Sequence, residues 1–108
     1  MWTALERIPA EELSWRWHRC QELLQRLLPA CGGILVFSRP NIYYLTGHWG
    51  NGVLWLPLEG APVFLARKGL ARAKLEIQDV RLDSLGSFRD IPKRLDALDT
   101  PLSETVAV

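Results

Sequence analysis

Apolar residues recur with the period of an α-helix along the first quarter of the chain. Positions four, three, four and three residues apart are apolar and would share one helical face: Leu13, Trp17, Cys20, Leu24 and Leu27. Pro9 suits a first helical turn, and Gly32 and Gly33 follow the predicted end of the helix. Trp15 falls almost opposite this face, as either an exposed surface aromatic or a contact with another domain.

The rest of the chain alternates short apolar runs with turn-forming segments. These patterns predict strands at residues 34–37, 53–56, 63–65 and 80–82, a single helical turn at 42–45, and helices at 68–76 and 88–98. The order predicts an α/β fold with a sheet covered by helices. The sheet is expected to be mixed, because the connector at residues 57–62 suits an antiparallel hairpin.

The length of 108 residues suits one core, so a single domain over residues 1–108 is expected. The apolar run at residues 105–108 predicts the start of another strand. A domain rarely stops inside a strand. This favours a longer parent protein, although a terminal edge strand is the alternative.

Composition narrows the classes of partner. Thirteen Lys and Arg residues against twelve Asp and Glu residues give a net charge of +1, which argues against a nucleic-acid partner. The sequence has no run of the roughly 20 apolar residues that a membrane span needs, so no membrane partner is expected. Cys20 and Cys31 lack a metal-ligand spacing and fit free thiols in the cytoplasm.

Known catalytic and metal-binding motifs are missing from the sequence. His18 and His48 belong to no HExxH motif, no GxSxG elbow is present, and the carboxylates are scattered. The glycines of residues 47–52 match neither a P-loop nor a GxGxxG fingerprint. We therefore expect no catalytic residue and no metal ligand in this chain.

One segment stands out, from Arg39 to the glycine-rich loop that carries His48, Trp49 and Asn51. One interpretation is a tight connector, in which Gly47 permits a positive φ. The alternative is a loop that offers an imidazole, an indole and an amide to a ligand or partner. Spacing alone leaves both interpretations open.

The residues PNIYYLTG at positions 40–47 resemble the signature of the amino-terminal domain of the creatinase/prolidase family, which includes Xaa-Pro dipeptidases and Xaa-Pro aminopeptidases. The predicted opening helix, which contains Glu12 and Arg16, and the strands around the signature agree with that family from about Pro9 to the end. The resemblance implies a ribonuclease H-like α/β fold with a mixed sheet. In full-length members a catalytic "pita-bread" domain follows, and we expect that residues 1–108 do not include it.

The resemblance also implies a function. In the family this domain supports dimer formation and partly covers the active site, with the loop after the signature near the entrance. His48, Trp49 and Asn51 are thereby candidates for contact with substrate entrance or partner, with His48 where Phe or Tyr is common. Trp15 and Trp55 are candidates for interdomain or subunit contacts.

We therefore expect a non-catalytic N-terminal domain of an Xaa-Pro dipeptidase-type metallopeptidase. Its expected partners are its own C-terminal catalytic domain and a second copy in a homodimer. No cofactor is expected in this chain, and two divalent metal ions would belong to the missing domain. The alternatives are a free-standing binding module, or the N-terminal domain of a creatinase-like amidinohydrolase or pseudoenzyme.

Overall fold

The computed structural model describes residues 8–77, 80–98, 100 and 106–107. The elements of this structure follow in chain order: α1 (Ala10–Leu27), β1 (Gly33–Val36), α2 (Arg39–Thr46), β2 (Asn51–Pro57), β3 (Val63–Lys68), α3 (Leu70–Glu76), β4 (Arg81–Ser84), the 3₁₀ turn η2 (Phe88–Asp90) and α4 (Ile91–Ala97).

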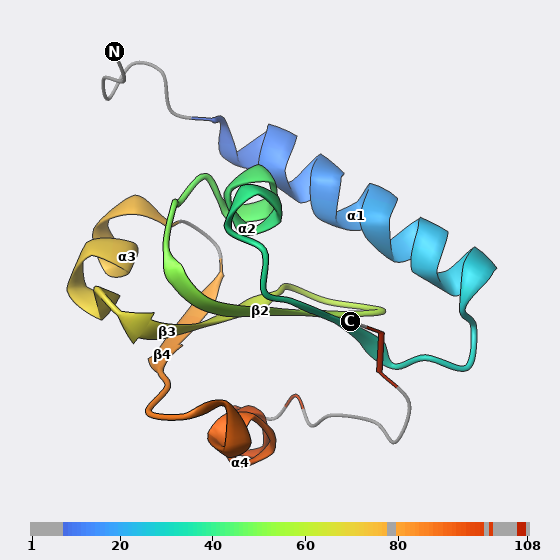
Figure 1. Ribbon diagram of the computed structural model, residues 1–108. Helices are drawn as coiled ribbons and strands as arrows, with labels where there is room; N and C mark the ends of the chain where they lie inside the picture. The colour runs from blue at the N-terminus through green and yellow to red at the C-terminus, as the bar shows by residue number, and fades with distance from the viewer. Residues whose placement is uncertain (1–7, 78–79, 99, 101–105, 108) are drawn as a thin grey trace.

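The four strands form one mixed sheet in the order β1-β2-β3-β4. The β1–β2 and β2–β3 pairs are antiparallel, and β3 pairs with β4 in parallel after the crossover through α3. In Figure 1, α1 and α2 lie on one side of the sheet and α4 lies on the other. The mixed sheet covered by helices that the sequence predicts is confirmed.

Alternation along the central strands divides the core into two clusters. Leu54 and Phe64 pack with α1, α2 and α3, whereas Val53 and Leu65 pack toward α4. All four side chains are fully buried because helices cover both faces of the sheet. Trp55 belongs to the α4 side at 1% exposure, and its Nε1 donates to Oγ1 of Thr100 at 3.0 Å. It is a core residue and presents no surface for the interdomain contact considered above.

Leu13, Trp17 and Leu24 of the predicted apolar face of α1 are buried, and Leu13 and Trp17 pack in one cluster with the sheet, while Cys20 is half-buried. Leu27 is 68% exposed, so the packed face ends one turn before the helix does. The same face contains buried Gln21, which the apolar pattern could not indicate. Its Nε2 donates to the carbonyls of Pro57 and Gly60, each at 2.8 Å, and so fixes the β2–β3 turn to α1.

The second helix, α2, is longer than the single turn that the sequence predicts. It begins at Arg39, with Pro40 in its first turn, and it contains eight residues. Proline is compatible with this position because the first N–H groups of a helix have no intrahelical acceptor. Gly47 ends the helix at φ +76°, and its N–H donates to the carbonyl of Tyr43 at 2.7 Å. The expected positive φ of Gly47 is therefore confirmed.

Side chains of α1 satisfy the last carbonyls of α2. A guanidinium nitrogen of Arg16 donates to the carbonyl of Tyr44 at 2.7 Å, and Trp17 Nε1 donates to that of Leu45 at 2.5 Å. Helix C-termini leave such carbonyls without intrahelical donors. These two bonds therefore hold the end of α2, and with it the start of the following loop, against α1.

The ends of other elements differ from the sequence-based ranges. Phe37 lies beyond β1 and is 41% exposed, and Lys68 ends β3 instead of opening a helix. Leu75 of α3 points to solvent at 75% exposure, so it does not support the core. Of the predicted strand at 105–108, Ala107 forms a parallel bridge with Ile34, and residues 105 and 108 lie outside the described part of the chain.

Candidate functional site

The loop between α2 and β2 borders a surface hollow of about 310 Å³. The residues around it come from α2, the loop, β2, β3 and α3: Arg39, His48, Trp49, Gly50, Asn51, Lys68, Gly69 and Arg72. All three predicted contact residues, His48, Trp49 and Asn51, thus line one feature. Their role at a substrate entrance stays a prediction.

His48 is turned into the protein and is only 4% exposed. Its Nδ1 lies 2.5 Å from Oε1 of Glu76 at the end of α3, and its ring meets that of Phe64 edge-on with centroids 5.8 Å apart. The imidazole therefore packs as an aromatic residue would at this position, and it also pairs with a carboxylate. This buried placement differs from the accessible imidazole that one interpretation of the loop predicted.

Glu76 links the loop to α3 through two side-chain contacts. One carboxylate oxygen contacts His48, and the other accepts from Nε of Arg72 at 3.0 Å. Burial acts to raise the pKa of Glu76, but the hydrogen bonds and charges of His48 and Arg72 together outweigh burial. The pKa of Glu76 consequently lies below its usual value, so the carboxylate remains charged beside His48.

The loop conformation depends on close contacts that the signature provides. Thr46 Oγ1 donates to the carbonyl of Ile42 at 2.7 Å and accepts from the N–H of His48 at 3.1 Å. A Cβ atom at Gly50 would overlap the imidazole ring of His48. Glycine is therefore required where the backbone passes the imidazole ring. The same turn leaves the side chain of the adjacent Trp49 exposed to solvent.

Trp49 is the exposed member of the three candidates, at 57%. Its ring meets that of Tyr43 edge-on with centroids 6.4 Å apart, so one edge of the indole is supported by α2. Asn51 is half-buried at the start of β2, where it pairs with Lys68 of β3 in the sheet register. The site thus offers one exposed aromatic surface beside a polar hollow.

The charged residues around the hollow were not identified from the sequence. Arg39, Lys68 and Arg72 line it, and no carboxylate from the described part of the chain does. They belong to α2, β3 and α3, which are far apart in the chain. Isolated basic residues are common on surfaces, so no local pattern could have singled them out.

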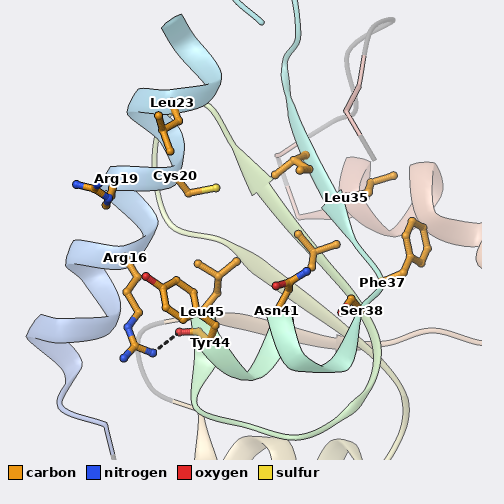
Figure 2. A pocket seen from close by; sticks show the side chains of 12 residues that line it. Arg16, Arg19, Cys20, Leu23, Leu35, Phe37, Ser38, Asn41, Tyr44 and Leu45 are labelled. Atoms are coloured by element: carbon orange, nitrogen blue, oxygen red, sulfur yellow. Dashed lines mark hydrogen bonds between the residues drawn. The ribbon is translucent and has the colours of Figure 1, made fainter. Parts of the chain in front are cut away.

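A second hollow, of about 560 Å³, lies between α1, β1 and α2. Figure 2 shows Cys20 and Leu23 on the α1 side of this groove, with Arg16 donating to the carbonyl of Tyr44 at one end. Leu35 of β1 points to the opposite face of the sheet, where it packs with the cluster beneath α4. Burial raises the pKa of the Cys20 thiol. The thiol is therefore protonated near neutral pH and is not an activated nucleophile.

The described residues do not form a metal-binding site. Residues 8–77, 80–98, 100 and 106–107 contain no group of three or more His, Cys, Asp or Glu side chains placed to hold a metal ion. The two divalent ions that the resemblance implies therefore have no ligand set in this part of the chain. Among the same residues, no helix is long and apolar enough to cross a membrane.

The family of the chain follows from comparison with known families. The model of the Creatinase/Prolidase N-terminal domain family matches residues 16–108, and the chain belongs to this family. The resemblance based on the signature is thereby confirmed. No protein with curated annotation matches the chain.

Solved structures support the same fold. The aminopeptidase P (Xaa-Pro aminopeptidase) of Streptococcus thermophilus superposes with a TM-score of 0.67 at 23% identity, covering 87% of this chain and 71% of that chain. An Xaa-Pro aminopeptidase of Streptococcus pyogenes gives a TM-score of 0.68 at 18% identity, with 85% and 71% covered. At these identities the likeness establishes the fold alone.

Proposed function

We propose that this chain is the non-catalytic N-terminal domain of an Xaa-Pro dipeptidase- or aminopeptidase-type metallopeptidase. In this proposal it partly covers the substrate entrance and contributes to a homodimer. The match over residues 16–108 supports the type of domain, and the named activity of the two solved neighbours supports the peptidase class. The observation that carries the role at the entrance is the exposure of Trp49, at 57%, beside a hollow shared with His48 and Asn51.

In this proposal a C-terminal catalytic domain carries out the reaction. Two divalent metal ions bound there would activate a water for attack on the peptide bond. The residues of this chain would shape the approach to that site and limit its contact with bulk water. The free thiols of Cys20 and Cys31 support a cytoplasmic location for the whole protein.

An assay of the purified 108-residue chain tests whether it lacks catalysis of its own. The chain is incubated with an Xaa-Pro dipeptide and added Mn²⁺ or Co²⁺, and free proline is measured. We expect no release above the protein-free control. Metal-dependent release that scales with chain concentration and disappears after heat denaturation would overturn the proposal.

The parent reading frame separates the alternatives. A frame that continues beyond Val108 into a domain with Asp, His and Glu metal ligands supports the metallopeptidase. A following domain without such ligands favours a creatinase-like amidinohydrolase or a pseudoenzyme. A stop codon directly after Val108 favours a free-standing binding module.

A further inference from the structure

Among the described residues, those that line the hollow beside Trp49 carry an excess of positive charge. Arg39, Lys68 and Arg72 line it. Arg72 is paired with Glu76, but within the described part of the chain no carboxylate forms an ion pair with Arg39 or Lys68. The whole sequence carries a net charge of only +1, so this excess is a local property of the hollow.

From this juxtaposition we infer that the hollow is a docking site for a carboxylate side chain on an acidic protein partner. The inference deepens the proposed function and rests on it, since it names the chemistry of the surface that the loop would meet. The volume of about 310 Å³ has room for one or two side chains. A carboxylate can bind a guanidinium through two parallel hydrogen bonds, so Arg39 gives the site directional recognition.

Trp49 supplies the apolar part of the same site. Tryptophan and arginine are the residues that most often carry binding energy at protein interfaces. The indole is 57% exposed and stands next to the cationic hollow. An acidic residue of the partner would enter the hollow, while an apolar neighbour of that residue would cover the indole.

The same observations favour an acidic protein, and not a nucleic acid or an anionic membrane, as the partner of the hollow. A nucleic-acid site needs an extended basic surface that neutralises several phosphates, and the near-zero net charge does not favour one. Binding to an anionic membrane usually relies on a basic amphipathic helix. Here the cations come from three different elements and converge on one small hollow.

The test uses the 108-residue chain labelled with ¹⁵N and two capped peptides of alternating residues. One peptide contains glutamate and leucine, and the other contains glutamine and leucine. Titration is followed at the indole N–H of Trp49. We expect saturable shifts with the glutamate peptide, binding about tenfold weaker with the glutamine peptide, and weakening between about 50 and 500 mM salt.

Variants locate the binding and supply the control. Lys68→Glu and Arg39→Glu should each weaken binding of the glutamate peptide about tenfold, because each reverses a cation of the hollow. Lys93→Glu makes the same charge change on α4, across the sheet, and should leave binding unchanged. Thermal melting of all three variants checks that the fold is retained.

Three results would overturn the inference. These are equal binding of the two peptides, unchanged binding by both Lys68→Glu and Arg39→Glu, or tighter binding of duplex DNA or anionic vesicles than of the glutamate peptide. The titration needs no hydrolase, so its failure can be separated from failure of the proposed function. An effect of Trp49 on turnover in the parent enzyme, without acidic-peptide binding here, would reject this inference alone.

Discussion

Nδ1 of His48 lies 2.5 Å from Oε1 of Glu76, although the two residues are 28 positions apart. The pair joins the loop after α2 to the C-terminal end of α3. Because His48 is held inward, the adjacent Trp49 remains at the surface beside the hollow. The loop that carries the three candidate residues is therefore positioned by a contact that neither the family signature nor the local sequence contains.

Replacing Glu76 with Gln should lower stability in a pH-dependent way. The pKa of Glu76 is depressed in the folded protein, so the charged carboxylate stabilises the fold above its unfolded pKa of about 4.3. That contribution disappears as pH falls through the lower, folded-state value. The variant should melt below the unsubstituted chain at pH 7, and the difference should shrink below about pH 4.

The measurement is the melting temperature of both proteins between about pH 3 and pH 7. Glu59→Gln, at an exposed position between β2 and β3, is the matched control and should show no such change. A melting difference between Glu76→Gln and the unsubstituted chain that stays constant with pH would contradict the role assigned to the carboxylate charge.

The two tryptophans of α1 should respond differently to substitution by phenylalanine. Trp17→Phe removes the buried donor to the carbonyl of Leu45 and leaves that acceptor without its partner, at a cost of about 1–3 kcal/mol. Trp15 is 54% exposed, and Trp15→Phe should change stability by less than about 0.5 kcal/mol. Urea unfolding measures both, and equal losses would show that the hydrogen bond of Trp17 does not hold α2.

Much of the fold could be predicted because its signals are local. The helical spacing of Leu13, Trp17 and Leu24 indicated the packed face of α1 correctly. The single turn predicted at residues 42–45 is shorter than α2, which begins at Arg39 and accommodates Pro40 in its first turn. Leu27 shares the apolar spacing of α1 but is exposed, because periodicity cannot tell where a helix extends past the sheet that it covers.

A methyl group at Gly52 should destabilise the sheet beside the candidate site. A Cβ there would lie 3.0 Å from Cα of Ala66 and closer still to the carbonyl oxygen of Leu65. Both are backbone atoms of a buried strand, so Gly52→Ala should cost about 1–3 kcal/mol. At Gly86 the nearest atom would be a side-chain oxygen of Asp90 at 3.6 Å, so Gly86→Ala is the control. Calorimetry that finds the two variants equally stable would contradict the packing described for β2 and β3.

The candidate site was only partly accessible to sequence reasoning. The loop was found because glycines and the signature surround it, and His48, Trp49 and Asn51 do line one hollow. Its cations were not found, since Lys68 and Arg72 join the site only after β3 and α3 have packed beside the loop. The inward turn of His48 was equally hidden, because it depends on a carboxylate that arrives from another helix.

The substitution Trp49→Ala in the full-length parent hydrolase tests most directly whether the domain acts at a substrate entrance through its exposed loop. Steady-state kinetics with an Xaa-Pro substrate and the melting temperature are measured together, with Trp15→Ala as the exposed control. We expect kcat/KM to change about tenfold for Trp49→Ala alone, because the indole would contact substrate or partner. Its melting temperature should stay within about 2 °C of the unsubstituted enzyme, as suits a surface residue. Unchanged kinetics together with a large fall in melting temperature would contradict the account and make Trp49 a structural residue.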